Sequence, residues 1–206
     1  MSATSRFLPI SVTAALLASA GIALAQGPAP APRFEVGAQV AVTRSGEFDS
    51  SDTGLGMRGA WRPSTRLGLE GEINLFPGDY AGSTPFSSHR LEGLFGATAG
   101  PQIGRVRPFG RARAGFLRLA SAPEPLACIA IVPPPLTCSL ASGKTLFVLD
   151  LGGGVQGRLT SRTFWRVDVG DRLVRYPGPT VDRDLESRDA FFGHDFRIAA
   201  GGGFTF

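Results

Sequence analysis

The sequence predicts an all-β fold, an eight-stranded antiparallel up-and-down transmembrane β-barrel. Three observations lead to this prediction. Apolar and polar residues alternate with period two along eight segments, which is typical of strands with one apolar face. Long and short connections alternate between these segments, and aromatic residues gather near the segment ends. These features indicate strands that cross a membrane back and forth.

The N-terminal part of the sequence is expected to precede the barrel. Residues 1–25 carry a single charge, Arg6, followed by an apolar run that ends in Ala-Leu-Ala, the pattern of a secretory signal peptide. An uncleaved anchor helix is the alternative, which the early proline and the small-residue ending disfavour. Residues 26–33 form an Ala/Pro-rich N-terminal tether, which should stay extended. The predicted barrel comprises residues 34–206.

The alternation is clearest in residues 65–75. There Leu67, Leu69 and Ile73 fall on one face, while Glu70 and Glu72 fall on the other. Each segment is about as long as the nine to eleven residues of a tilted membrane-spanning strand. The eight predicted strands are residues 34–42, 54–61, 65–75, 88–100, 109–118, 144–159, 162–175 and 195–206.

The connections place the long loops at one end of the barrel. The second, fourth and sixth connections are short, whereas the first (TRSGEFDSSD), third, fifth and seventh are long. This is the arrangement of short periplasmic turns and longer extracellular loops. The fifth connection contains Cys128 and Cys138, and a disulfide between them is expected in an oxidising compartment.

Aromatic residues predict two girdles. One group lies near the short-turn end and another beside the long loops, as in barrels with aromatic belts at both interfaces. Alternation alone leaves open which face points outward, so a soluble periplasmic barrel with an apolar interior, like a lipocalin, is a rival. The first group is Phe34, Trp61, Phe109, Trp165 and Phe206; the second is Phe76, Tyr80, Phe86, Tyr176, Phe191, Phe192 and Phe196.

Over residues 34–206 the chain resembles the small eight-stranded outer-membrane barrels of Gram-negative bacteria, of the OmpA-like and OmpX-like type. The resemblance rests on the signal segment, the strand and loop alternation, and the ending Phe204-Thr205-Phe206. It implies a monomer in the cell outer membrane, in contact with lipid and lipopolysaccharide. It also implies that Phe204 and Phe206 are a signal to the barrel-assembly machinery.

If the apolar face meets lipid, charged residues of the other face point into the lumen. An eight-stranded barrel is just wide enough for side chains to fill it, so these residues should form a packed network of arginine and carboxylate pairs. The alternative is a narrow channel. Asp171 breaks the pattern, and a bulge at Gly170 or a place near the outer interface would accommodate it. The network residues are Arg58, Glu70, Glu72, Arg90, Glu92, Arg111, Arg113, Asp150, Arg158, Arg166, Asp168, Arg172 and Arg197.

The sequence offers weak candidates for catalysis. A lipid A deacylase-like enzyme would need a serine activated by a histidine that a carboxylate orients, and Ser87 or Ser88 with His89 and Glu92 could supply these groups. An ordinary surface histidine is the favoured interpretation. Neither His89 nor His194 has a second histidine at metal-ligand spacing, so neither a metal site nor a cofactor is expected.

The stretch DLGGGVQGRL contains Gly152, Gly154 and Gly157 in the spacing of a dinucleotide-binding loop. Such a loop must follow a strand and open a helix, whereas these glycines lie within an alternating segment. We therefore expect Gly152 and Gly154 to make room for arginine side chains. The arginines are dispersed among acidic residues, which argues against nucleic-acid binding. A structural, surface-interaction or envelope-maintenance role is expected, with an extracellular ligand at the long loops as a further hypothesis.

Overall fold

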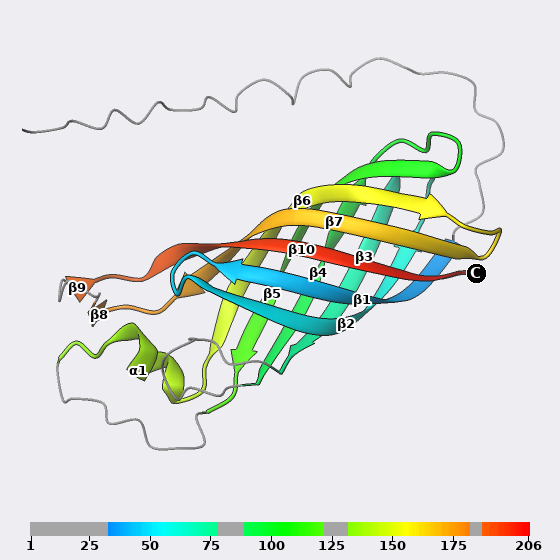
Figure 1. Ribbon diagram of the computed structural model, residues 1–206. Coiled ribbons are helices and arrows are strands. Elements are labelled where there is room, and N and C mark those ends of the chain that lie inside the picture. The colour runs from blue at the N-terminus through cyan, green and yellow to red at the C-terminus, as the bar shows by residue number, and fades with distance from the viewer. Residues whose placement is uncertain (1–32, 78–88, 122–131, 182–186) are drawn as a thin grey trace, which may run out of the picture.

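Eight antiparallel strands close into a single barrel in the computed structural model, which describes residues 33–77, 89–121, 132–181 and 187–206 (Figure 1). The predicted fold class is confirmed. The predicted signal peptide and nearly all of the predicted tether lie outside the described residues. The barrel strands are β1 (Arg33–Ser45), β2 (Ser50–Arg62), β3 (Leu67–Phe76), β4 (Arg90–Ala99), β5 (Val106–Leu119), β6 (Thr145–Arg158), β7 (Thr163–Tyr176) and β10 (Phe191–Thr205).

Every barrel strand pairs with its neighbours in the chain, and β1 closes the barrel against β10. In this closing pair Ala38 lies opposite Gly202 and Val42 opposite Ile198, in an uninterrupted antiparallel register. Closure leaves the barrel with no unpaired strand edge, which is the condition for burying backbone polar groups in lipid.

Three further elements lie at one end of the barrel (Figure 1). They are the helix α1 (Leu136–Ala141) and the two-stranded sheet of β8 (Thr180–Val181) and β9 (Ser187–Arg188). The C-terminus lies at the opposite end, with the short turns. Across the described ranges of the chain, no helix is long and apolar enough to span a membrane.

The first connection is shorter than expected from the sequence. The strands β1 and β2 extend to Ser45 and Ser50, so that residues 46–49 alone form the turn. Arg44 donates to Asp49 Oδ1 at 2.9 Å, and Asp49 has a φ of 46°, a left-handed conformation that aspartate tolerates better than most residues. The predicted long loop was wrong here, because the polar residues TRSGEFDSSD continue the hairpin instead of leaving it.

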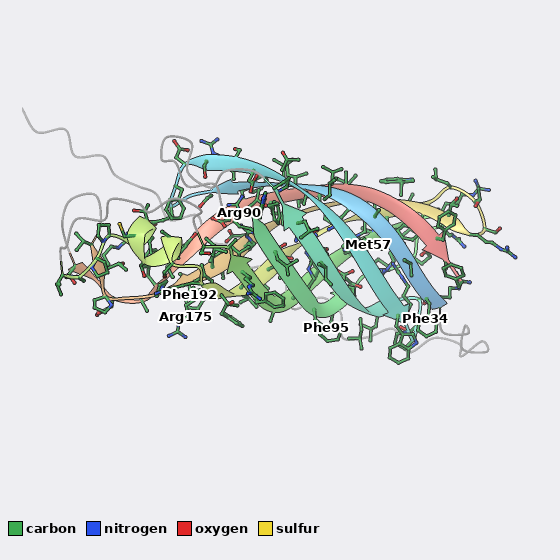
Figure 2. The ribbon with its side chains drawn as sticks, turned by 90° about the horizontal axis from the view of Figure 1, so that it is seen from below. Phe34, Met57, Arg90, Phe95, Arg175 and Phe192 are labelled. Carbon is green, nitrogen blue, oxygen red and sulfur yellow. The ribbon has the colours of Figure 1, made fainter. Side chains whose placement is uncertain are left out.

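Apolar side chains cover the outside of the barrel and polar side chains fill its inside. In β3, Leu69 and Ile73 are exposed by 40% and 60%, whereas Glu70 and Glu72 are buried. The same arrangement of apolar side chains on the outside is seen in Figure 2, where Met57 and Phe95 point away from the barrel. An outward apolar wall suits lipid rather than water. The lipocalin-like alternative was therefore wrong.

Several aromatic residues do not lie where the girdle prediction put them. Phe109 is buried in the lumen, as are Phe76 and Tyr176. They fall on the inward-facing register of their strands, a property that depends on exact strand parity. Phe34, Trp61, Trp165 and Phe206 are exposed as expected, and so are Phe192 and Phe196; Phe191 is half-buried, and Tyr80 and Phe86 lie outside the described residues.

The lumen at the long-loop end is apolar. Inward-facing leucines and valines of the barrel pack there with Tyr176, and α1 covers them with Leu136 and Leu140. Burial of this apolar surface excludes water from the mouth. The barrel residues of this outer cluster are Leu94, Leu117, Leu119, Leu146, Val148, Val174 and Tyr176.

The glycines of the stretch DLGGGVQGRL lie within β6. A Cβ at Gly154 would lie 2.2 Å from the Val167 carbonyl oxygen, 2.8 Å from Asp168 Oδ1 and 2.9 Å from the Phe109 ring. The space beside Gly154 is thus occupied by the Asp168 carboxylate and the Phe109 ring and not by the guanidinium group that the sequence predicted.

Candidate functional site

The middle of the lumen holds a dense set of buried charges. Twelve of the thirteen charged residues expected there are buried, the exception being Arg158. Counting every buried residue of the described part, nine arginines lie inside together with seven carboxylates, and an eighth carboxylate, Asp52, is 11% exposed at its side chain. The nine arginines are Arg58, Arg62, Arg90, Arg107, Arg111, Arg113, Arg166, Arg172 and Arg197.

Arg113 of β5 lies at the centre of this set. Its guanidinium donates to Glu72 Oε2 at 2.5 Å, Asp150 Oδ2 at 2.6 Å and Glu70 Oε1 at 3.2 Å. The neighbouring Arg111 donates to Asp150 through Nε at 2.9 Å. Carboxylates from β3 and β6 are thereby joined across the lumen by arginines of β5, whose planar, permanently charged groups bind several oxygens at once.

A second group lies toward the short-turn end. Arg166 of β7 donates to both oxygens of Glu70, at 2.8 and 3.1 Å, and to Asp168 at 2.7 Å. Arg58 Nη2 also donates to Glu70, to Oε2 at 2.8 Å. The Arg166 guanidinium also lies 4.0 Å from the centroid of the Phe109 ring, a favourable cation–π distance.

A third group lies toward the long loops. Arg172 donates to Glu92 at 2.5 Å and to Asp195 at 2.6 Å. Arg197 contacts Glu72 and also lies 3.7 Å from Glu92, and Arg90 is paired with Asp52. Glu70 links the first and second groups and Glu72 links the first and third, so the three groups are connected along the lumen.

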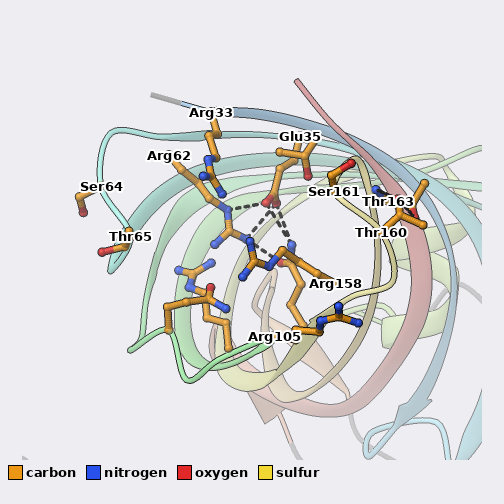
Figure 3. A pocket seen from close by; sticks show the side chains of 14 residues that line it. Arg33, Glu35, Arg62, Ser64, Thr65, Arg105, Arg158, Thr160, Ser161 and Thr163 are labelled. Carbon is orange, nitrogen blue, oxygen red and sulfur yellow. Dashed lines mark hydrogen bonds and ion pairs between the residues drawn. The ribbon is translucent and has the colours of Figure 1, made fainter. Parts of the chain in front are cut away.

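The short-turn end of the barrel contains a cavity of about 240 Å³ (Figure 3). Glu35 lies in its wall, where Oε2 accepts from Arg62 Nη2 at 2.8 Å and both carboxylate oxygens accept from the Gln156 amide at 3.1 Å. Arg158 also lines the cavity, exposed, and donates to the Gly104 carbonyl oxygen at 3.1 Å. Arg158 therefore belongs to this mouth and not to the buried set in which it was expected.

Solved structures with the same architecture are small outer-membrane barrels. Neisserial surface protein A is 15% identical, with a TM-score of 0.55, over 85% of this chain and 97% of that chain. The chain has the fold of a small outer-membrane β-barrel. Ail of Yersinia pestis, solved with the heparin analogue sucrose octasulfate, is 14% identical with a TM-score of 0.46 over 85% of this chain and 99% of that one.

The N-terminal barrel domain of Pseudomonas aeruginosa OprF is 12% identical, with a TM-score of 0.44, over 84% of this chain and 97% of that chain. No protein-family model and no curated protein matches the sequence. In barrels of this kind the short turns are periplasmic and the longer loops extracellular. The cavity therefore lies at the periplasmic mouth, and α1 lies at the extracellular end.

Asp171 lies on the outer wall of the outer-membrane barrel, toward the extracellular end. The registers of β7 with β6 and with β10 are uninterrupted, so no bulge occurs at Gly170. Asp171 Oδ2 lies instead 2.7 Å from His194 Nδ1 of the adjacent strand, both side chains being largely exposed. A polar partner near the outer interface, where charge is less costly than at mid-bilayer, accommodates this residue.

The candidate catalytic residues are not brought together. Glu92 is completely buried in the lumen with Arg172 and Asn74, whereas His89 is exposed at the end of the barrel. Glu92 therefore cannot orient His89, because alternate strand positions point to opposite faces. Ser87 and Ser88 lie outside the described residues. Within the described ranges, no group of three or more His, Cys, Asp or Glu side chains is arranged to hold a metal ion.

Cys138 lies in α1 and is disulfide-bonded. Cys128 lies outside the described residues, so the Cys128–Cys138 pairing stays a prediction. Phe204 and Phe206 are exposed at the periplasmic end of β10, and their role in assembly also stays a prediction.

Sequence reasoning missed five charged residues of the interior. Glu35, Asp52, Arg62, Arg107 and Asp195 occupy inward positions at the ends of their strands. Each continues the inward parity of its own strand. Asp52, Arg62 and Arg107 were missed because the predicted strands stopped short of them. Glu35 and Asp195 lie within the predicted strands 34–42 and 195–206 and were left out of the predicted network although their positions alternate inward.

Proposed function

We propose that this protein is a closed outer-membrane barrel that serves the integrity of the cell envelope and does not conduct ions or solutes. The observation that carries the proposal is the burial of the central charges. Glu92, Asp150 and Arg197 have no exposed surface, and Arg113 has 1%. A water-filled path through the lumen would have to pass these side chains and would expose them.

The proposed lumen network supports this role energetically. Eight of the nine buried arginines are ion-paired with carboxylates. Opening a path would separate buried opposite charges, and leaving one such charge without its partner costs about 3–5 kcal/mol. The apolar cluster beneath α1 adds a second, water-excluding barrier at the extracellular mouth.

Single-channel recording in planar bilayers tests the proposal. The purified protein is first shown to be folded by a shift in gel migration on boiling, that is, to be heat-modifiable. After insertion into the bilayer it should give no conductance steps. A matched preparation carrying Arg113→Gln and Asp150→Asn retains shape but weakens the central pairs, and it should show brief openings. Regular conductance steps from the wild-type protein would contradict the closed-barrel proposal and favour the narrow channel.

The extracellular end supports a surface-interaction role as part of the same proposal. Val181 donates to the Pro134 carbonyl oxygen at 3.1 Å, Arg188 lies 3.6 Å from Glu47, and the Tyr176 ring packs against Phe48 and Phe191. The described parts of three connections are thus joined into a cap at this end of the barrel. Function in barrels is commonly carried by such loops on a rigid wall.

A deletion strain distinguishes a function carried by the closed barrel from a function carried by the extracellular cap. Loss of the protein should increase leakage of periplasmic enzymes and sensitivity to bile salts. A variant with residues 132–143 replaced by a Gly-Ser linker should restore the barrier if the wall carries the function. Failure of that variant, despite normal folding and abundance, would assign the function to the cap.

A further inference from the structure

Arg107 differs from every other buried arginine of the described barrel. It is 2% exposed, yet no carboxylate lies within ion-pair distance of it among the described residues. Its Nη2 reaches only the Thr98 hydroxyl at 3.3 Å and the Arg66 carbonyl oxygen at 3.5 Å, while Nε and Nη1 have no hydrogen-bond partner. A buried guanidinium left in this state is costly.

The residues that line the periplasmic cavity carry an excess of positive charge, so a partner for Arg107 would have to come from outside the chain. Arg107 is one of five arginines that line it, against a single carboxylate, Glu35. Glu35 is already engaged by Arg62 and Gln156, so it does not neutralise the remaining four. Those four are Arg33, Arg105, Arg107 and Arg158.

The remaining wall of the cavity is polar and uncharged. It consists mainly of hydroxyl and amide side chains, among them Ser64, Thr65, Gln102, Thr160 and Thr163 (Figure 3). These groups donate and accept hydrogen bonds but carry no charge. The cavity of about 240 Å³ is smaller than the range of about 300–1,000 Å³ that drug-sized ligands occupy. It therefore suits a small polar molecule rather than a polymer or an acyl chain.

We propose that the periplasmic mouth is a binding site for a phosphate or carboxylate group of a small polar solute, with Arg107 as the buried anchor. Charge-assisted hydrogen bonds from Arg107 would satisfy its free Nε and Nη1 donors, and planar guanidinium groups match both oxyanions. The exposed Arg33, Arg105 and Arg158 would attract the anion to the mouth. A phosphate of a neighbouring phospholipid offers the same chemistry from a different source.

Calorimetric titration of the purified mature protein in detergent micelles with inorganic pyrophosphate tests the proposal. Binding at one site per barrel is expected, and it should weaken in about 0.5 M NaCl because salt screens the mouth arginines. Arg107→Gln should weaken binding about tenfold or more, since it removes the charge-assisted contacts. The same variant should keep or raise the urea midpoint, because it removes an uncompensated buried charge.

Two further variants keep the test decisive. Arg105→Gln, in an exposed turn, should weaken binding several-fold and carries the test if Arg107→Gln does not fold. Arg175→Gln removes an exposed guanidinium at the extracellular end, where it lies 6.0 Å from the Phe192 ring. This control should bind pyrophosphate as the wild type does.

The source of the anion is distinguished in nanodiscs. Competition of phosphatidylglycerol with pyrophosphate would identify a lipid headgroup as the ligand, whereas unchanged binding in anionic and zwitterionic discs would identify a free solute. The proposal is overturned if the wild-type protein binds none of pyrophosphate, phosphate and citrate and shows no preference for anionic lipid. Equal affinity of wild type and Arg107→Gln would overturn it as well.

Discussion

At the scale of single residues, charge partners decide what each buried side chain contributes. Arg113 and Arg107 belong to the same strand and are equally buried. Arg113 contacts three carboxylates, whereas Arg107 contacts none in the described structure. The first therefore stabilises the barrel, while the second has only the Phe109 ring, 5.7 Å away, beside its two weak hydrogen bonds and carries a cost that the proposed anion would offset.

Replacement of Arg113 by glutamine should destabilise the barrel. Glu70, Glu72 and Asp150 would each lose a buried partner, and the expected loss in free energy of unfolding is about 3–5 kcal/mol. Urea unfolding in detergent micelles measures it. Arg175→Gln, at an exposed position, should change stability by less than about 0.5 kcal/mol. Equal stability of the two variants would show that the central pairs contribute little.

Replacement of Gly154 by leucine should prevent proper folding. A Cβ there already lies 2.2 Å from the Val167 carbonyl oxygen, which cannot move without breaking the sheet. The matched control is Gly59→Leu, because no atom lies within 4 Å of a Cβ at Gly59. The heat-modifiable band on an unboiled gel should disappear for the first variant and persist for the second. Persistence in both would contradict the steric argument.

The positions of single side chains were the part of the structure that the sequence predicted least well. Alternation identified Glu70, Glu72 and Asp150 as inward-facing, because they lie in the middle of clear two-residue patterns. The same alternation puts Phe109 inside together with Arg111 and Arg113, and it was assigned to a girdle only because it is aromatic. Alternation did not reveal that Arg158 lies at the mouth, because depth along the lumen and side-chain partners from distant strands are not encoded in any local pattern.

At the scale of elements, the strands were predictable and the cap was not. Period-two alternation identifies each strand independently of the others, and all eight exist. The helix α1 has six residues, and it is stabilised by packing of Leu136 and Leu140 on the barrel end rather than by its own sequence. Such short helices depend on tertiary contacts, so their position could not be predicted from the sequence.

Substitution of Leu140 by aspartate should release α1 from the barrel end. Lys144 is the only lysine of the chain, and its Nζ donates to Ser139 at the end of the helix. A lysine-specific protease therefore has one site, beside α1. Because a carboxylate is costly in an apolar cluster, cleavage of Leu140→Asp should be about tenfold faster than that of the wild type. Thr137→Asp, the same change on a half-buried position, should be cleaved as the wild type is.

At the scale of the whole molecule, the orientation in the membrane can be tested with the same single site. Lys144 lies at the long-loop end, which is extracellular in outer-membrane barrels. Protease added to intact cells should therefore cut the Leu140→Asp variant without any permeabilisation of the envelope. Cleavage only after the outer membrane has been opened would reverse the orientation and would move the arginine-lined mouth to the cell surface.

The buried ion pairs also constrain how the molecule can be assembled. Arg113 and Arg166 reach Glu70 across 43 and 96 positions of sequence, so these pairs exist only once β3, β5 and β7 share one closed wall. An arginine exposed to lipid at mid-bilayer costs about 2–4 kcal/mol, and a half-inserted sheet would expose several. Insertion one hairpin at a time is therefore disfavoured. The strands have to curl around their polar face before or while they enter the hydrocarbon, which makes barrel closure and membrane entry a single event.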